Sequence, residues 1–426
     1  GVTDQWEEIW FPVKEIGGMQ EVSPLGILNV TRENGMLQLG VNALAFVKAK
    51  VSVESNGKKV FSEERLFKPE DVYKTSVKLD DDAPYNVKVE GMDLEHSSDN
   101  PKLIKRPFKT NIPADSTSAF SFYQEGIQFK ENRSYEPAMK SLKQCLKTDP
   151  LFIDAMTALV ELYYRRNQLD SALYFANQAL QLDAYDPSAN YYAGVTYRAQ
   201  GNWIDALETL GWAARSMQFR SEAYSQMAGI EMQLYDYELA KQYANQSLDY
   251  NRFNFNAMTV LAVVERQEGN LLQANKMLDA ILSLDPLNHF ADFERYRLNN
   301  IPENLQIFKS RITNEFPYQT YLELALTYNS LGLKNDAISV LENAPEQPLI
   351  LIWKAYLKQD SSQLEAAARL TPDFVFPYRT ETVSALNWAV QNDTSWKFKY
   401  YLGLNYWAIQ RDADALRIFR DRKSVV

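Results

Sequence analysis

The residue types that carry most enzyme chemistry are few in this sequence, and they lie far apart. The 426-residue chain holds one cysteine, Cys145, and two histidines, His96 and His289. A single cysteine cannot form an intrachain disulfide or a cysteine-rich zinc site, and the two histidines lack metal-ligand spacing. Cys145 falls at a small inward position of a helical pattern, so a buried, unreactive thiol is expected. The sequence therefore predicts no metal site and no cofactor.

Carboxylates are abundant, and a suitably separated pair could serve glycoside hydrolysis. The adjacent acids are Glu63-Glu64, in a strand pattern, and Asp80-Asp81-Asp82, in a turn pattern. Such acids limit strand pairing at a sheet edge or shape a turn, and these roles are favoured. The aspartate run also lacks the spaced oxygen ligands of a calcium loop.

Local motifs of catalysis are missing as well. The sequence contains no phosphate-binding glycine loop, dinucleotide fingerprint, nucleophile elbow or H-E-x-x-H pattern. Together with the scattered histidines and cysteine, this predicts that the chain is not an enzyme. We therefore expect the protein to function by binding a partner. Its helices and strands must then form the surface that binds.

The first hundred residues follow the two-residue period of β-strands. Asn34-Gly35 and Asn56-Gly57 each separate two alternating apolar runs, which is the strongest short signal for a type I′ hairpin. With roughly seven strands, residues 1–100 are predicted to form an immunoglobulin-like or fibronectin-like β-sandwich. The expected strands are 9–13, 27–30, 36–41, 50–54, 59–61, 73–79 and 85–89.

A proline-rich segment separates this region from the rest of the chain. Residues 101–117 contain Pro101, Pro107 and Pro113 among several lysines and arginines. Proline cannot donate a backbone hydrogen bond and restricts the residue before it, so an extended connector is predicted. We favour a segment that packs against one of the two domains over a segment that binds a partner.

From residue 118 onward the apolar period is helical, and a longer repeat is superimposed on it. Ala138, Ala172, Ala206, Ala240 and Ala274 recur at a spacing of 34 residues. Two antiparallel helices approach closely only where a small side chain permits it, so these alanines are expected in the helix–helix contacts. Each hairpin leaves one apolar face for its neighbour, and the hairpins are predicted to stack into a superhelix.

This pattern resembles the tetratricopeptide repeat (TPR), whose period is 34 residues. The resemblance extends to small residues early in the first helix, to aromatic residues three positions later, and to Pro150 and Pro286 at repeat ends. It implies a multidomain chain with an all-β sandwich followed by an all-α TPR superhelical solenoid at residues 118–426. Repeats are expected at 119–152, 153–186, 187–220, 221–254, 255–288, 318–351 and 396–422, with a degenerate stretch at 289–317 and irregular helices at 352–395.

A second resemblance covers the whole chain. Trp6 to Val13, Ile16-Gly17-Gly18 and Leu28-Asn29-Val30-Thr31 are similar to a region of large bacterial proteins of unknown function. In those proteins a galactose-mutarotase-like domain precedes a segment of this kind and a TPR array. The resemblance implies the C-terminal part of a longer protein linked to carbohydrates, and it carries over no catalytic residue.

Charge and hydropathy restrict the partners. The formal net charge is −10, and no basic stripe is present in the repeats, which argues against a nucleic acid partner. No apolar run approaches the length that a membrane span needs, so no membrane insertion is expected. Gly1 indicates an excised fragment or a tag remnant. The compartment is unknown: the cytoplasm is favoured, and the periplasm stays open if the native N-terminus carried an export signal.

The candidate binding residues are assigned by the TPR resemblance, in which one face of each first helix lines a concave groove. The lysine and asparagine positions that clamp a peptide carboxylate in some TPR proteins are occupied by other residues here. What remains is a groove rich in tyrosine and arginine, which dominate interface hot spots. The candidates are Tyr123, Tyr164, Arg165, Tyr191, Arg198, Tyr224 and Arg266, with a second aromatic patch at Trp396, Tyr400 and Trp407.

For each tyrosine, solenoid packing is an equally good interpretation, and for the second patch a covering helix is favoured over sugar stacking. The leading hypothesis is a non-catalytic scaffold that binds a protein or peptide on the concave face. The alternative is an accessory region of a carbohydrate-active protein, with carbohydrate contacted through the parent protein. Self-association through the array is a third hypothesis.

Overall fold

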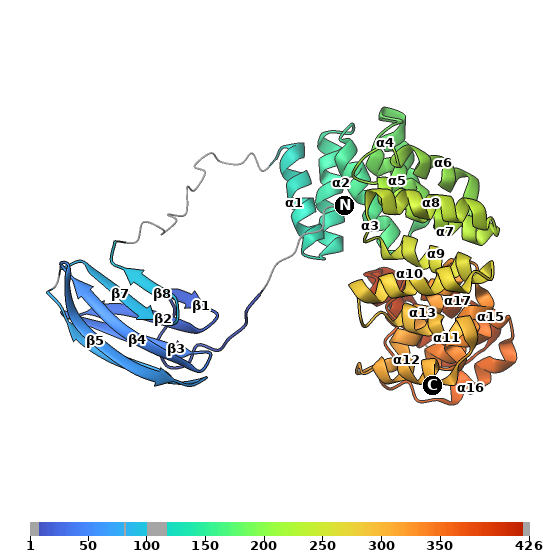
Figure 1. The fold of residues 1–426 in the computed structure, drawn as a ribbon. Helices are drawn as coiled ribbons and strands as arrows, with labels where there is room; N and C mark the ends of the chain where they lie inside the picture. The colour runs from blue at the N-terminus through green and yellow to red at the C-terminus, as the bar shows by residue number, and fades with distance from the viewer. Residues whose placement is uncertain (1–7, 81, 100–116, 421–426) are drawn as a thin grey trace. The chain divides into compact units, whose positions relative to one another are not determined.

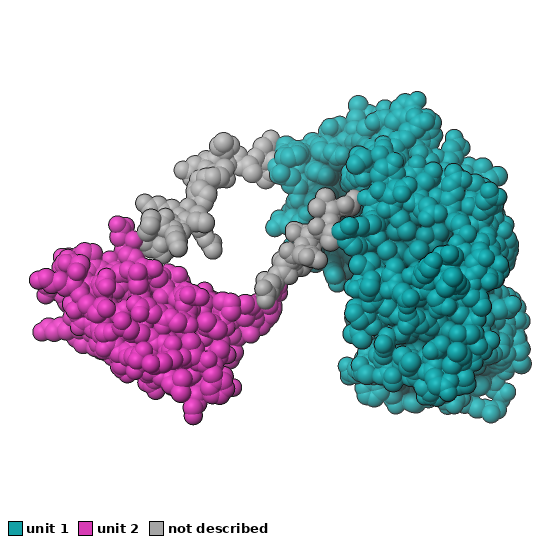
Figure 2. Space-filling view, in the orientation of Figure 1, with its two compact units in different colours: residues 1–2, 114–426 teal, residues 3–113 magenta. Residues whose placement is uncertain are grey.

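The chain folds into two compact units (Figure 2). One consists of strands and the other of helices. The computed structural model describes residues 8–80, 82–99 and 117–420. Of the described residues, those up to 99 belong to the first unit, and residues 117–420 belong to the second.

The first unit is a sandwich of two four-stranded antiparallel sheets (Figure 1). One sheet has the order β1-β2-β3-β6 and the other the order β5-β4-β7-β8. Leucines and valines from both sheets form one buried cluster between them. The strands are β1 (Glu21–Ser23), β2 (Gly26–Glu33), β3 (Met36–Ala43), β4 (Val47–Ser55), β5 (Lys58–Phe67), β6 (Val72–Lys78), β7 (Tyr85–Glu90) and β8 (Leu94–Ser97).

Both Asn-Gly hairpins are confirmed. Asn34 and Gly35 connect β2 to β3 with φ angles of 52° and 72°, and Asn56 and Gly57 connect β4 to β5 with 49° and 71°. Positive φ at both central residues is the requirement of a type I′ turn, whose twist matches that of the flanking strands. The sheet order also places β5 at an edge, so Glu63-Glu64 lies on an edge strand as predicted.

The strand list needs one correction and two additions. Residues 9–13 carry no strand, although their apolar run was predicted to form one. Trp10 is almost fully exposed, and Pro12 lacks the N–H that a ladder position needs. β1 and β8, with three and four residues, escaped prediction because such short strands show almost no alternation.

The second unit is a series of antiparallel helix pairs (Figure 1). The first helices of successive pairs contact one another, so they form one layer of the array. Five pairs are regular: α1 (Ala119–Glu131) with α2 (Tyr135–Thr148), α3 (Ile153–Arg165) with α4 (Leu169–Leu182), α5 (Pro187–Ala199) with α6 (Trp203–Ala213), α7 (Arg220–Leu234) with α8 (Tyr237–Tyr250), and α9 (Phe255–Gln267) with α10 (Leu271–Leu284).

The later helices are less regular. They are α11 (His289–Asn299), α12 (Pro302–Arg311), α13 (Pro317–Ser330), α14 (Lys334–Glu342), α15 (Pro348–Lys358), the 3₁₀ turn η1 (Ser361–Gln363), α16 (Leu364–Arg369), α17 (Thr382–Asn392), α18 (Trp396–Ala408) and α19 (Asp412–Arg420). Pro302, Pro317 and Pro348 each stand at the first position of a helix, where the missing N–H breaks no helical hydrogen bond.

The 34-residue register is confirmed in the regular pairs. All five alanines of the series are 0% exposed, and each lies on the second helix of its pair. A Cβ added at Gly194 of α5 would lie 2.6 Å from Cγ of Leu210 on α6, so the two helices leave no room for a larger residue. The turn inside each pair holds a left-handed residue at the same spacing: Arg133, Asn167, Gly201, Tyr235 and Gly269.

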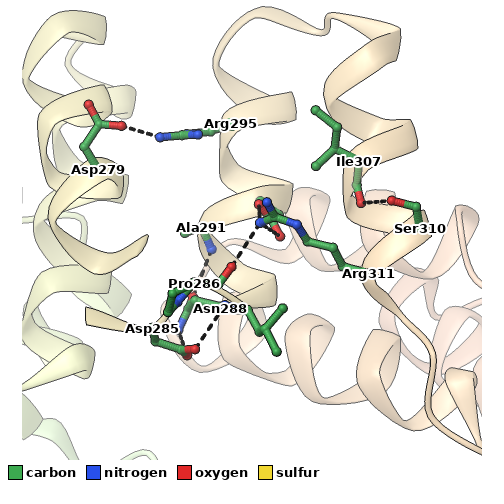
Figure 3. A network of polar contacts seen from close by, with 11 residues as sticks. Asp279, Asp285, Pro286, Asn288, Ala291, Arg295, Ile307, Ser310 and Arg311 are labelled. Carbon is green, nitrogen blue, oxygen red and sulfur yellow. Dashed lines mark hydrogen bonds and ion pairs between the residues drawn. The ribbon is translucent and has the colours of Figure 1, made fainter. Parts of the chain in front are cut away.

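The sixth pair, α11 with α12, breaks the register because Phe308 occupies the position where alanine is due. Phe308 is 0% exposed, and its ring packs edge-on against Phe293 and Tyr321 at centroid distances of 5.1 and 5.4 Å. Figure 3 shows how polar contacts attach this pair to α10. Arg295 pairs with Asp279 of α10, and Arg311 contacts the carbonyl oxygen of Pro286, just after α10.

Candidate binding cavity

A cavity of about 420 Å³ lies on the layer of first helices. Its lining comes from α3, α5, α7, α9 and the start of α6, and from the end of α13 and Glu381, just before α17. We call it the Arg198 cavity. Eight of the lining residues carry neutral hydroxyl or amide groups: Ser225, Gln226, Gln233, Asn256, Thr259, Thr327, Asn329 and Ser330.

Arg198, at the end of α5, is the one cation in that lining. Its Nη1 donates to Oε1 of Gln226, and its Nη2 donates to the carbonyl oxygen of Ser330 at 3.2 Å. Within the described part of the chain, no carboxylate forms an ion pair with it, and burial lowers the pKa of its guanidinium. A guanidinium has five N–H donors, so donors remain for a ligand.

A glycine on the neighbouring helix makes room for this guanidinium. A Cβ added at Gly229 of α7 would lie 2.7 Å from Nη2 of Arg198. The arginine therefore lies against the backbone of α7, where any larger side chain would displace it. Gly229 is not a position that the repeat register requires to be glycine, so its identity is explained by the cavity.

Of the seven predicted groove residues, Tyr164 and Arg198 line this cavity. Tyr191 lies outside the lining and stacks on Phe219 at a centroid distance of 4.9 Å. Burial, followed by the charge of Glu222, raises the pKa of the Tyr191 hydroxyl. This tyrosine therefore packs between helix pairs and stays neutral at ordinary pH.

Two further predicted tyrosines take part in packing between helices. Tyr123 lies against Phe152 at 5.1 Å between ring centroids. Tyr224 is stacked with Tyr243 and Tyr250 of α8, at 6.1 and 6.3 Å. Both side chains are half-buried, so part of each ring is still exposed.

The two other predicted arginines are held by acids. Arg165 donates through Nε to Glu161 at 2.9 Å, and its side chain is more than half exposed. Arg266 is 11% exposed and bonds Glu294 at 2.5 Å and Asp336 at 3.3 Å. Because both carboxylates are buried, Arg266 joins α9 to α11 and α14 and is not available to a partner.

The second aromatic patch lies along α18. Trp396 and Tyr400 are 5.8 Å apart between ring centroids, and Tyr400 contacts Phe419 of α19 at 6.3 Å. Trp407, two turns further along the same helix, is 62% exposed. The patch is separate from the Arg198 cavity, whose lining contains none of its residues.

Metal-binding groups do not gather in the described residues. No cluster of three or more histidine, cysteine or acidic side chains is placed to hold a metal ion in that part of the chain. Cys145 is buried, as expected, and burial raises the pKa of its thiol to about 11. In the described helices, none has both the length and the apolar composition needed to cross a bilayer.

Sequence reasoning missed the residues that close the cavity from the second half of the chain. Ser225, Asn256 and Thr259 stand at groove positions of the repeat, so a register-based search finds them. Thr327, Asn329 and Glu381 carry no such signal. They reach the cavity because the array bends back on itself.

Two sequence families match parts of this chain. Residues 126–232 match the fifth ARM-repeat domain of TT21, and residues 25–97 match the second domain of YphG-like proteins. The first match falls on helix pairs whose alanines are buried in a 34-residue register. The helical unit is a TPR-type repeat array. No curated protein matches the chain.

Solved TPR structures are similar to parts of the chain at low identity. A TPR protein from Parabacteroides merdae is 16% identical with a TM-score of 0.40, over 67% of this chain and 98% of that chain. The Pseudomonas aeruginosa protein pilF is 20% identical with a TM-score of 0.42, over 51% and 95%. YrrB, a TPR protein with an unusual peptide-binding site, is 17% identical with a TM-score of 0.33, over 55% and 100%.

Proposed function

We propose that the helical unit is a non-catalytic scaffold that binds a partner protein, and that a segment of this partner contacts the Arg198 cavity. The single observation that supports this most is a guanidinium held beside neutral side chains without an acidic partner. A buried or half-buried cation without a counter-charge is unfavourable unless something else compensates it. A ligand group with negative charge would supply that compensation.

The neutral side chains around Arg198 suit the recognition of a polypeptide segment. Amide and hydroxyl groups can donate to and accept from a backbone, and Tyr164 and Trp203 add aromatic surface. The volume of about 420 Å³ lies within the range of ligand-binding pockets. A scaffold needs no catalytic group, and the proposal invokes none.

The test begins with a photo-reactive amino acid at Thr259, used to capture the partner by irradiation in the source organism. Affinity of the purified partner is then measured for three variants of the whole chain. Arg198→Gln is expected to weaken binding tenfold or more, as loss of a charge-assisted contact does. Gly229→Ala keeps the arginine but displaces it, and the same direction of change is expected.

Two control variants accompany these measurements. Arg165→Gln removes an arginine from the equivalent end of α3 that is already paired with Glu161. Gly211→Ala adds a Cβ on α6 where nothing lies within 4 Å. Both should bind the partner as the wild type does. If Arg198→Gln and Arg165→Gln bind equally well, the cavity is not the binding site.

A further inference from the structure

One outer face of the β-sandwich carries buried side chains, although it points away from the core. Side chains alternate along a strand, so the residues between the core leucines and valines of β2 and β3 point outward. These outward residues are Ile27 opposite Asn42 and Asn29 opposite Gly40. Ile27 is 0% exposed, and Asn42 and Asn29 are 3% and 8% exposed. Something other than the second sheet therefore covers this face.

The cover is a short segment before β1, residues 14–16. Asn42 bonds the backbone of Lys14 twice: its Oδ1 accepts from the N–H at 2.8 Å, and its Nδ2 donates to the carbonyl oxygen at 3.0 Å. Asn29 donates through Nδ2 to the carbonyl oxygen of Ile16 at 2.7 Å. The Asn42 amide thus presents one donor and one acceptor to a single residue, as a neighbouring strand does.

A gap in the sheet accepts the one apolar side chain of this segment. A Cβ added at Gly40 would lie 2.6 Å from Cβ of Ile16, so the isoleucine fills the place of a missing side chain. Ile16 is buried, and Glu15 reaches Lys74 of β6 at 3.9 Å. We call Asn29, Gly40 and Asn42 the docking site. It recognises a main chain through two amides and a branched aliphatic side chain through a gap.

The docking site needs an occupant. A buried amide that loses its hydrogen-bond partner costs free energy, and two such amides belong to this site. The occupant also adopts an unfavourable conformation, because Glu15 has a φ of 57°. Such a conformation persists only where the residues around it are firmly held, and both neighbours of Glu15 are bonded to the sheet.

The chain on either side of the segment is suited to exchange. Gly17 and Gly18 connect it to the sheet, and Gly17 has a φ of 83°. Glycine adopts either sign of φ readily, so these two residues can redirect the segment. On the other side, residues 8–13 form no strand and expose the apolar side chains of Ile9, Trp10 and Val13, with Trp10 88% exposed.

We propose that residues 8–16 form an exchangeable arm, and that two copies of this chain dimerise by each placing residues 14–16 on the docking site of the other. A second copy fits because its segment is identical, so every contact made within one chain is remade between chains. The exposed apolar side chains of the arm then lie against the second copy. Their burial favours the dimer over the closed chain.

The first measurement is the mass of the whole chain in solution over a series of concentrations. Sedimentation equilibrium is expected to show a rise from the mass of one chain toward that of two. A mass of one chain at every concentration would overturn the proposal.

The second measurement asks which surface joins the copies. A Glu15→Cys chain is mixed with a Lys74→Cys chain and oxidised, and mass spectrometry follows the disulfide between positions 15 and 74. Both side chains are more than half exposed, and the native Cys145 is buried. Because each chain carries only one of the two new thiols, this link forms only where the arm of one copy lies on the sheet of another.

Lys48 supplies a matched control for that link. It is also a strand lysine that is more than half exposed and paired with a glutamate, but it lies on β4 of the other sheet. Glu15→Cys should link to Lys74→Cys about tenfold faster than to Lys48→Cys, because docking raises the local concentration of the thiol. Equal rates would overturn the proposal even where a dimer forms, since another surface would then join the copies.

Two variants test the docking site itself. Asn42→Leu in the Lys74→Cys chain removes both bonds to Lys14, and the rate of linking is expected to fall about tenfold. Ile16→Ser in the Glu15→Cys chain should have the same effect and leaves the sheet unchanged. Circular dichroism verifies folding. A rate of linking that both variants leave unchanged would overturn the assignment of this site.

Asn86→Leu is the control for the asparagine. Asn86 is a strand asparagine of the other sheet, and its Nδ2 donates to Glu95 at 2.8 Å. Its replacement should leave the rate of linking within about twofold of the parent, because it makes no bond to the arm. Arg198→Gln should leave the rate unchanged as well, so failure of the arm exchange and failure of the proposed function are observed separately.

Discussion

The two halves of the helical unit achieve close packing by different means. In the five regular pairs, alanine at a fixed register lets the helices approach, and Ala274 of α10 is the last of this series. One repeat later the same register holds Phe308, whose ring fills the space between α11 and α13. Small-residue packing repeats one geometry, whereas aromatic packing allows a different one at each pair.

This difference has a consequence for the Arg198 cavity. A strictly repeated geometry yields a regular superhelix with an accessible inner face. The irregular pairs change the direction of the array, and turns near residues 330 and 410 reach the edge of the first half. The regular half thus supplies most of the cavity lining, and the irregular half closes it.

The largest effect is expected for Phe308→Ala. Removing a fully buried ring leaves a cavity, and the free energy of unfolding should fall by about 3–5 kcal/mol. Urea denaturation of the whole chain measures it. Ile307→Ala on the same helix truncates a half-exposed side chain and should cost about 0.5 kcal/mol. Similar losses for both variants would contradict the packing role given to Phe308.

The opposite change in the regular half is Ala274→Leu. Alanine there is 0% exposed, so a larger side chain should overpack α9 and α10 and cost about 1–3 kcal/mol. The same denaturation measurement applies. Gln273→Leu, at the exposed neighbouring position, is the matched control and should change stability by less than about 0.5 kcal/mol. Tolerance of Ala274→Leu would show that the register is not a packing constraint.

A smaller, pH-dependent effect is expected at Glu161 of α3. Burial raises the pKa of this carboxyl, but hydrogen bonds from Lys130 at 2.8 Å and Arg165 at 2.9 Å outweigh burial, so the pKa lies below its ordinary value of 4.5. A lowered folded-state pKa stabilises the fold above pH 4.5, and this stability is lost as the pH falls through the lowered value.

Glu161→Gln should therefore cost about 1 kcal/mol at pH 7, and the difference from the wild type should shrink below pH 4.5. Urea denaturation at pH 7, 5, 4 and 3 gives the profile. A difference that grows as the pH falls would show that burial, and not the two cations, dominates at this residue.

The smallest effect is expected for Glu365→Ala in α16. Glu365 pairs with Arg369 one turn later, but both side chains are about three-quarters exposed. Solvent screens such a pair, so a loss of about 0.3 kcal/mol is expected. A loss above 1 kcal/mol, measured in the same way, would mean that α16 depends on its surface charges more than on the buried Leu364 and Ala367.

The sequence by itself determined the local geometry of this protein. Asn-Gly pairs specify type I′ hairpins because only such residues readily adopt positive φ, and the alanine spacing specifies the helix pairs because a close helical approach tolerates only small side chains. Its groove positions also include Arg198 and Tyr164, which line the Arg198 cavity. Residues 9–13 were predicted wrongly, since their apolar run is not paired with any strand.

Only the tertiary structure decided which of these positions line the Arg198 cavity. Arg198 and Arg266 occupy the same position of the repeat and Arg165 lies one position later, yet Arg165 and Arg266 are held by acids and Arg198 is not. That distinction depends on Glu294, Ser330 and other residues that are far along the chain. Whether two such distant residues meet depends on the packing angles of all the helix pairs between them. No local sequence pattern encodes the combined effect of those angles.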